Sequence, residues 1–285
     1  MNRLKNLLKF SAPKGPGYRL SSGFYLSVLA TRNPMPSLLQ IIHPQGADGA
    51  VHGFGVPLAQ QTDKSELIRP LHRGAYGLAS LDRKTVLRMT VVSKEEAGFD
   101  PQAIVRSSFA AEFGPEVVNR IGATWSLLQF TFESHDPEVL PALNFLITLV
   151  TRIGGLTDGI IADPLAETYR LPEQYLTPSE FRIDHHLSVT HGTTSTALVT
   201  HGMAKINQPE IVLPEVPPEL THLATPFLLG VGESVFRRGP LRPGVMVGSP
   251  SAPFSIAESG SQPVSWELIP ARGQTVEQCL MQWKP

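Results

Sequence analysis

The chain has 285 residues and a formal net charge of −1 at pH 7, which argues against a dedicated nucleic-acid-binding protein because such proteins usually carry a basic excess. Hydrophobic residues make up 41% of the chain and charged residues 17%, so the composition supports a packed core and excludes wholesale disorder. The single cysteine, Cys279, excludes an internal disulfide and a cysteine-based zinc cluster, and it fits a reducing compartment.

The first ten residues, MNRLKNLLKF, place basic and leucine side chains at helical spacing, and the linker-like stretch SAPKGPGY follows. They lack the uninterrupted apolar region of a signal peptide. No apolar run in the chain approaches the roughly 20 residues of a membrane span. We therefore predict an amphipathic turn and linker over residues 1–22 that docks on the protein's own body. Docking on a partner protein and weak contact with a membrane surface stay open as alternatives.

The segment from Gly23 to Val92 predicts short strands separated by turns. The runs GFYLSVLAT and LLQIIH are rich in residues that suit a pleated surface, whereas GADGAVHGFGVPLAQQ has the composition of a loop. In KTVLRMTVVS, Leu87, Met89 and Val91 alternate with polar residues, which predicts a strand with one solvent-exposed face.

Two helices and a strand are predicted in the middle of the chain. Asp100 followed by Pro101 is typical of a helix start, and Gly114 marks the expected end of that helix. The stretch GPEVVNRIGA predicts a second short helix. In TWSLLQFTFES, Leu128 and Phe130 alternate with polar residues, which predicts a half-buried strand.

A strand, a helix and a strand follow one another between Trp125 and Ala162. Asp136 and Pro137 repeat the helix-start pattern, and PEVLPALNFLITLVTRIGG has an apolar stripe at helical spacing, with its Gly-Gly pair as the expected stop. The stretches DGIIAD and ETYRL are the next predicted strands. A crossover of this length favours a parallel or split arrangement with the helix on one sheet face.

The C-terminal part predicts a hairpin between Phe181 and Met203, a Pro-rich connection over NQPEIVLPEVPPEL and an amphipathic helix opened by prolines and containing Pro226. The stretches GVMVGS, PFSIAE and PVSWELIP predict short strands, and a final amphipathic turn contains Cys279. The whole pattern predicts an α+β protein with a mixed or antiparallel sheet and helices packed on one face. Residues 23–285 form the predicted body, and two similar halves divided near residue 175 are one arrangement that the pattern allows.

The hairpin holds four of the chain's nine histidines. If its loop is centred on Thr193 and Thr194, His186 faces His201 across the two strands, with Cβ atoms roughly 5 Å apart. Two imidazoles at that separation could share a zinc ion, with Asp184 or Glu210 as the third ligand.

Two other interpretations of the histidines stay beside the metal site. The favoured one is a structural hairpin in which histidine is an adaptable polar residue, because no known ligand spacing such as H-E-x-x-H occurs. The other is general acid–base use of one histidine. Serine and histidine also occur together in STALVTH, but no acidic residue stands at a position that would orient the imidazole.

The stretch VTHGMAKINQPEIVLPEVPPEL resembles a segment of a group of uncharacterised bacterial proteins. The matching residues are Thr200, His201, Gly202, Met203, Lys205, Pro209 and Glu210. The stretch GGLTDGIIADPLAETY is similar to the same group, whereas Ile206 and Asn207 depart from its Phe-Gly pattern. The resemblance covers about a third of the chain and implies a bacterial cytoplasmic α+β protein, without an activity to carry over.

These observations favour a non-enzymatic interaction or structural protein that works within a larger bacterial assembly, with a protein partner or further copies of itself. No cofactor is expected in that case. The first alternative is a metal-dependent hydrolase centred on His186 and His201, with zinc as the metal. A further alternative is an immunity or toxin-neutralising binding protein.

Overall fold

The structure is a computed structural model that describes residues 19–43, 55–58, 64–133, 138–192, 196–260 and 263–283. The predicted N-terminal turn and the linker as far as residue 18 lie outside the described residues. So do the helix-start pair Asp136 and Pro137, the hairpin tip at Thr193 and Thr194, and most of the glycine-rich stretch before Gly55.

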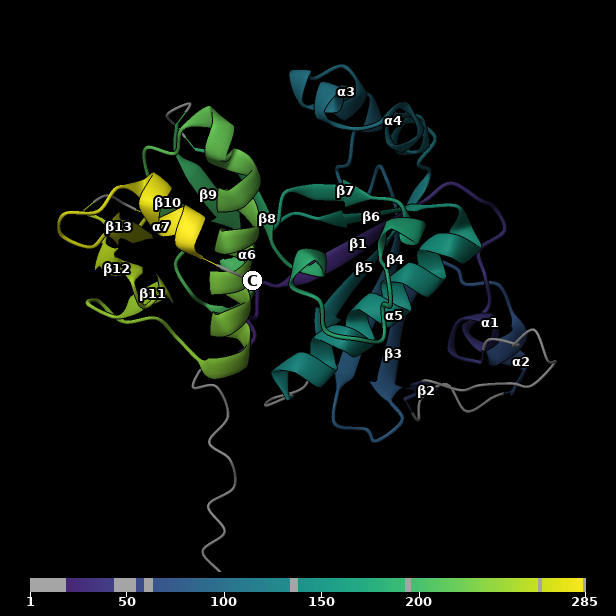
Figure 1. Cartoon of the computed structure of the whole chain (residues 1–285). Coiled ribbons are helices and arrows are strands. Elements are labelled where there is room, and N and C mark those ends of the chain that lie inside the picture. Colours follow the sequence, from purple (N-terminus) through teal and green to yellow (C-terminus); the bar gives the residue numbers. More distant parts are fainter. Residues whose placement is uncertain are drawn as a thin grey trace, which may run out of the picture.

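Two β-sheets and several helices form an α+β fold, which confirms the predicted class (Figure 1). The first sheet has seven strands in the order β2-β3-β4-β5-β1-β6-β7, and every neighbouring pair is antiparallel. The second has six strands in the order β11-β12-β13-β10-β9-β8, with one parallel pair, β10 and β13.

The strands of the seven-stranded sheet are β1 (Tyr25–Ala30), β2 (Gly55–Pro57), β3 (Gly74–Ser80), β4 (Val86–Ser93), β5 (Ser126–Phe132), β6 (Ile160–Asp163) and β7 (Thr168–Arg170). Those of the six-stranded sheet are β8 (Ser188–His191), β9 (Leu198–His201), β10 (Ile211–Leu213), β11 (Met246–Ser249), β12 (Ala252–Glu258) and β13 (Trp266–Pro270). The α-helices are α1 (Leu38–Ile42), α2 (Lys64–Ile68), α3 (Pro101–Val105), α4 (Pro115–Gly122), α5 (Val139–Thr157), α6 (Thr221–Arg238) and α7 (Val276–Gln282). The 3₁₀ turns are η2 (Ser108–Glu112), η3 (Pro172–Gln174), η4 (Ile183–His185), η5 (Met203–Ile206) and η6 (Pro218–Leu220).

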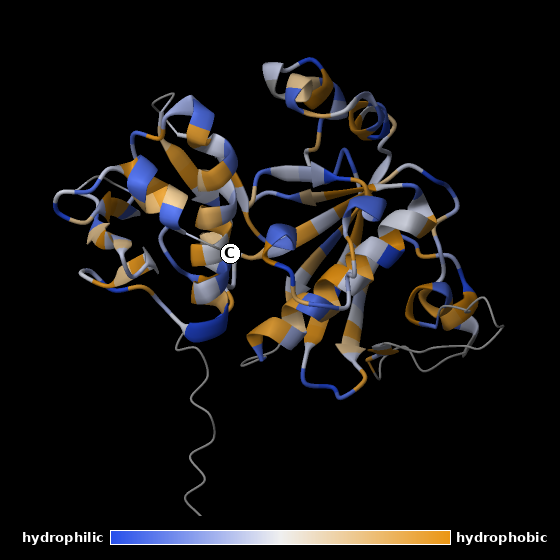
Figure 2. Cartoon of the chain, in the orientation of Figure 1, coloured by the Kyte–Doolittle hydropathy of each residue, from blue (hydrophilic) through white to orange (hydrophobic). Residues whose placement is uncertain are grey.

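The central unit is a split β-α-β crossover, as the spacing of its elements predicts. Strand β1 lies between β5 and β6 and is antiparallel to both, so β5 and β6 run parallel to each other. Helix α5 connects them and lies across one face of the sheet, where hydrophobic residues gather (Figures 1 and 2). Its inward stripe is fully buried and consists of Val139, Leu143, Leu146, Ile147 and Val150.

The apolar character of α5 follows from this packing. With 19 residues and a mean hydropathy of 1.6 it is long and apolar enough to cross a membrane, contrary to the expectation that no segment comes close. Half of it is buried inside the protein, which is what a core helix requires. The described residues therefore do not suggest an integral membrane protein.

Helix α4 adds a small second cluster on the opposite face of the seven-stranded sheet. Its Val117 and Ile121 pack against Leu29, Leu127 and Ile160. The next residue along each of these three strands belongs to the main core instead. Because side chains alternate along a strand, this sheet is apolar on both faces near α4.

The main core also includes the helix and strands of the second sheet. Helix α6 buries Phe227, Leu228 and Val231 in the same cluster as Phe254 and Ile256 of β12. The rings of Phe227 and Phe254 lie 5.0 Å apart. One continuous core therefore includes residues from both sheets.

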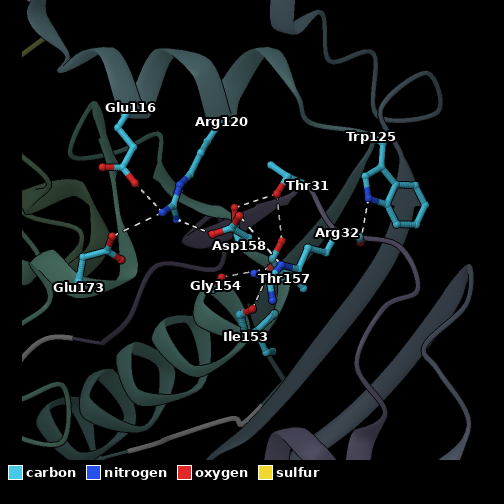
Figure 3. A network of polar contacts seen from close by, with 10 residues as sticks. All are labelled: Thr31, Arg32, Glu116, Arg120, Trp125, Ile153, Gly154, Thr157, Asp158 and Glu173. Atoms are coloured by element: carbon cyan, nitrogen blue, oxygen red, sulfur yellow. Dashed lines mark hydrogen bonds and ion pairs between the residues drawn. The ribbon is translucent and has the colours of Figure 1, made fainter.

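The C-terminal end of α5 lies two residues beyond the predicted Gly-Gly stop. Asp158 adopts the left-handed conformation (φ 51°, ψ 35°) that ends the helix, and its backbone amide donates to the Gly154 carbonyl (Figure 3). The Gly159 amide donates to the same carbonyl at 2.8 Å. The Thr157 carbonyl accepts from the backbone amide of Arg32 at 3.0 Å, and the Asp158 carboxylate pairs with Arg120 at 3.2 Å. Tertiary partners of the last carbonyls, rather than glycine alone, decide where the helix ends.

Two other predicted elements are wrong. The run LLQIIH, predicted as a strand, forms helix α1 because Ser37 and Gln40 make a capping box at its start. The Pro-rich connection contains β10, a central strand of the second sheet. The helix that starts at Asp100 also ends early, at Val105, where the Ser107 hydroxyl donates to the Ile104 carbonyl at 2.7 Å.

Several other elements predicted within the described residues are confirmed. Strand β4 buries Leu87, Met89 and Val91 and exposes Arg88. Helix α4, strands β5, β6 and β7, the three C-terminal strands and the final helix also lie where the sequence predicts them. Cys279 is buried in that last helix.

Gly159 gives a test of the packing at the α5–β1 contact. A Cβ at this position would lie 2.7 Å from the Leu29 carbonyl oxygen and 2.9 Å from the Thr157 hydroxyl. Gly159→Ala should lower the free energy of unfolding by about 1–3 kcal/mol through overpacking. Gly155→Ala, where nothing lies within 4 Å, should raise it by about 0.5–1 kcal/mol. Urea denaturation measures both, and equal effects of the two substitutions would contradict this account of the contact.

Candidate functional site

A buried ion pair joins the two sheets. Asp163 ends β6 of the first sheet, and Lys205 lies in η5, which follows β9 of the second. The Lys205 ammonium donates to the Asp163 carboxylate and to the His186 carbonyl, and its side chain is fully buried. The other Asp163 oxygen accepts from the amides of Leu165 and Ala166 at 3.2 and 3.1 Å.

Burial and pairing act on Lys205 in opposite directions. Burial lowers the pKa of the Lys205 ammonium, whereas the neighbouring Asp163 carboxylate favours its charged form. The ammonium also lies 5.3 Å from the centroid of the Phe24 ring, a favourable place for a cation. Removing one member of such a pair costs about 3–5 kcal/mol, because the other is left as an unpaired buried charge. We call Asp163, His185, His186, Lys205 and Glu210 the buried junction.

The two adjacent histidines of the junction are packed as aromatic side chains. The His186 ring packs against two phenylalanine rings, with its centroid 5.4 Å from that of Phe181 and 6.1 Å from that of Phe236, and these two are themselves 5.8 Å apart. His185 lies 5.2 Å from the Tyr175 ring. Neither imidazole makes a hydrogen bond of good geometry within the described residues, although the Leu176 backbone lies near enough to favour the charged form of His185.

Both buried histidines are therefore neutral at physiological pH. Burial lowers the pKa of His185 from 6.5 to about 4, and it lowers the pKa of His186 well below 6.5. The Lys205 ammonium adds to the shift of His186. Burial also raises the pKa of the nearby Tyr175 phenol, and the Arg170 guanidinium lies 5.9 Å from the centroid of that ring.

The predicted register of the hairpin is wrong. Ser188, not His186, lies opposite His201, and His191 lies opposite Leu198. His186 precedes β8 and is buried, whereas His201 ends β9 and has Thr190 and Glu167 as its partners. The separation of roughly 5 Å that motivated a shared zinc ion therefore does not follow from the strand pairing.

The expected third ligands also have other partners. The Asp184 carboxylate pairs with Arg182 at 2.8 Å; burial acts to raise its pKa, but Arg182 outweighs this and the net pKa is lowered. Glu210 accepts from the Thr200 hydroxyl at 2.8 Å and from the Gly202 amide at 3.0 Å. Within the described part of the chain, no group of three or more His, Cys, Asp or Glu side chains is placed to hold a metal ion.

The segment from Thr200 to Glu210, which resembles the group of uncharacterised bacterial proteins, makes structural contacts in this protein. Gly202 has φ 118°, and a Cβ there would lie 2.4 Å from the His186 carbonyl oxygen, so only glycine fits. The Thr200 hydroxyl accepts from the Ile211 amide at 2.8 Å and donates to Glu210. Burial raises the pKa of Glu210, against the hydrogen bonds that it accepts. Met203 and Lys205 are buried.

His201 links three elements through both of its ring nitrogens. Its Nε2 atom lies 2.8 Å from the Thr190 hydroxyl of β8, and its Nδ1 atom lies 3.4 Å from the Glu167 carboxylate in the β6–β7 turn. This is the acidic neighbour that the sequence around STALVTH does not provide. We call Thr190, His201 and Glu167 the hydroxyl–imidazole–carboxylate relay.

Within the described residues, no helix covers one face of the six-stranded sheet. Helix α6 covers the face that carries Leu198, Ile211, Leu268 and Phe254, all of which are buried. The other face is only partly buried or exposed, and we call it the open face. Its strand residues in the described chain are Ser188, Thr190, Val199, His201, Val212, Met246, Pro253, Ser255, Ala257, Glu267 and Ile269.

The open face is largely apolar and almost uncharged. Met246 of β11 and Ile269 of β13 both flank Ser255 and are 49% and 44% exposed. Val199 and Val212 extend the apolar surface toward β8. The solvent side of an antiparallel sheet is usually polar. Sequence alternation predicts the strands, but it does not indicate which of their faces a helix covers.

The chain matches no protein-family model, no curated protein and no solved structure. Its similarity to a group of uncharacterised bacterial proteins therefore stays a prediction. Its function has to be inferred from the geometry of its own residues.

The buried histidines predict a pH-dependent stability. In the unfolded chain they take up protons near pH 6.5, whereas in the folded protein their lowered pKa values keep them neutral. The free energy of unfolding should therefore fall as the pH drops from 6.5 toward 4, by at most about 1.4 kcal/mol per pH unit for each histidine.

The control is His186→Phe, which keeps an aromatic ring against Phe181 and Phe236 but cannot titrate. Urea titrations between pH 8 and pH 4.5 should give a shallower loss of stability for this variant than for the wild type. Above about pH 7 the two curves should run parallel. Identical slopes at low pH would show that His186 is not held neutral by the fold.

Proposed function

We propose that this protein is a non-enzymatic interaction protein that works within a larger bacterial assembly, and that its open face is the binding surface. The observation that carries the proposal is the apolar character of that face. Met246 and Ile269 are exposed on either side of Ser255, Val199 and Val212 are partly buried on the neighbouring strands β9 and β10, and no described helix covers them. Exposed apolar surface of this kind marks binding sites on proteins.

The placement of the polar groups supports the same proposal. The charged members of the buried junction are bonded to one another or to backbone groups, so they hold the fold and are not presented to solvent. The open face is built on strands of a rigid sheet rather than on loops, which preorganises it for association. A binding protein that neutralises a toxin is one form of this function.

Lysine substitutions on the open face test the proposal. Met246→Lys and Ile269→Lys should leave the free energy of unfolding within about 1 kcal/mol of the wild type, because both side chains are already exposed. Capture from lysate of the source cells should yield a stoichiometric protein partner with the wild type and lose it at least tenfold with these variants.

The matched control is Leu81→Lys, a leucine that is 59% exposed in the β3–β4 turn, away from the open face. This variant should capture the partner as well as the wild type does. Equal loss with all three variants would show a general effect of charge. A strictly monomeric wild type that captures nothing would count against an interaction role.

A hydrolase is the second candidate, and the relay is the specific observation that favours it. Thr190 stands where a nucleophile would, His201 Nε2 where its base would, and Glu167 where the residue that orients the base would. Thr190 would attack an ester carbonyl, His201 would take the hydroxyl proton and return it to the leaving alkoxide, and water would hydrolyse the acyl-threonine. The open depression of about 370 Å³ that Glu167 lines includes neither Thr190 nor His201, so the interaction role is preferred. A metal-dependent hydrolase centred on His186 and His201 stays a weaker alternative without the predicted strand pairing.

A fluorophosphonate probe followed by peptide mapping tests the relay. Under the hydrolase hypothesis the probe should label Thr190, and His201→Gln should reduce labelling at least a hundredfold. Thr190→Ser should retain it, since serine keeps the hydroxyl. The interaction hypothesis predicts no labelling of the wild type.

A further inference from the structure

We infer that the partner of the open face presents an amphipathic helix whose apolar stripe carries one lysine or arginine, and that this cation pairs with Glu267. The inference rests on the proposed role of the open face and names the chemistry of its partner. Glu267 lies on β13 between Val212 of β10 and Ala257 of β12, in the middle of the open face. Any molecule that covers the face therefore also covers this carboxylate.

Glu267 is partly buried and has no partner among the described residues. Its side chain makes no ion pair and no hydrogen bond with them. Two carboxylates of the buried junction differ in this respect, since Asp163 pairs with Lys205 and Glu210 accepts from the Thr200 hydroxyl. Glu267 thus serves no polar contact within the described fold and is available to a molecule outside it.

An occupant of the open face removes water from Glu267 as well as from the apolar side chains around it. Burying a charge without a partner is strongly unfavourable. The face itself cannot supply the counter-charge, because its strand residues include no lysine or arginine in the described chain. The occupant must therefore combine apolar side chains with a cation.

A second copy of the chain docked face to face does not meet this requirement. Besides Glu267, the described strand residues of the open face include one histidine, His201, which already has Thr190 and Glu167 as its neighbours. Because Glu267 lies in the middle of the face, a two-fold pairing of open faces brings two carboxylates into one interface without a cation for either. This arrangement is repulsive.

The size and relief of the open face fit a helix. Small side chains surround Glu267 on this face, among them Val199, Val212, Ser255 and Ala257, so the surface is shallow. The opposite face of the same sheet is covered by α6, a helix of 18 residues (Figure 1). Six strands about 4.8 Å apart are about 24 Å wide, which a helix of about 16 residues spans at about 1.5 Å per residue. A helix on the open face would give the sheet a helical layer on both sides.

The position of the cation within that helix follows from the position of Glu267. Apolar side chains lie on both sides of this carboxylate, with Val212 and Val199 toward β8 and Ile269 and Met246 toward β11. Helix residues three and four positions before and after a given residue lie on the same side of the helix. The recognised helix should therefore carry its lysine or arginine in the middle of the stripe, with apolar residues at those spacings around it.

Selection from a displayed library of helical peptides on the full-length chain tests the inference. The peptides have about 16 residues, and only the positions of one helical stripe are randomised. The wild type should enrich peptides with one lysine or arginine flanked by apolar residues, and Glu267→Lys should enrich an acidic residue at the same position. Glu258→Lys, on the other face of β12, is the matched control and should enrich the basic family. Ile269→Lys should lower recovery of that family at least tenfold.

The affinity of one selected peptide gives a second measurement. Glu267→Gln keeps the shape of the side chain and should weaken binding at least tenfold, because removing one member of a covered charge pair leaves the other unpaired. Replacing the cation of the peptide by glutamine should weaken its binding to the wild type by a similar factor. The two changes together should weaken binding no more than either change alone, since both remove the same contact.

Three results would overturn the inference. Enrichment of apolar helices without a basic residue, or of one family by both the wild type and Glu267→Lys, would remove the role of Glu267 and leave the proposed function in place. A wild type that enriches no helix would refute a helical partner, and the proposed function would then depend on the lysine substitutions of the open face alone. A wild type that is dimeric in light scattering and monomeric as Ile269→Lys would identify a second copy of the chain as the occupant.

Discussion

The ion pair between Lys205 and Asp163 is the interaction on which the relation of the two sheets depends. It connects the end of β6 to the turn after β9, and both side chains are buried. The same lysine holds the His186 carbonyl, and its own carbonyl accepts the Ser21 amide at the start of the described chain. A buried ion pair adds little net stability over an apolar pair, but leaving one member unpaired is costly. The pair therefore restricts how the sheets can pack rather than driving their association.

The rest of the junction follows from this restriction. Once Lys205 is directed at the His186 carbonyl, the backbone next to His186 approaches Gly202 so closely that no side chain fits there. His186 is then enclosed by Phe181 and Phe236, where only its neutral form is stable. The histidines, lysine and glutamate that attract attention in the sequence thus serve the fold. The exposed apolar surface lies elsewhere, on the open face of the second sheet, which α6 does not cover.

Part of this arrangement could be predicted from the sequence. Alternation of apolar residues correctly locates β4 and β5, and the helical stripe locates α5, because each pattern reports burial within one segment. The run LLQIIH misleads because a capping box outweighs β propensity in so short a segment. The hairpin register differs by two residues along β8, which preserves the faces but removes the contact between His186 and His201. A turn centre assumed from two threonines does not determine register.

The sequence by itself determined the class of fold, most of the elements and which residues of each strand share a face. Only the tertiary structure decided which face is covered, that Asp163 finds Lys205, and that Glu167 finds His201. The physical reason is the distance along the chain over which each kind of interaction acts. Periodicity records how a segment alternates between a buried and an exposed side, and it is complete within a few residues. Pairing of charges across 42 residues, and the choice of the face on which α6 packs, depend on how all the segments fill one core.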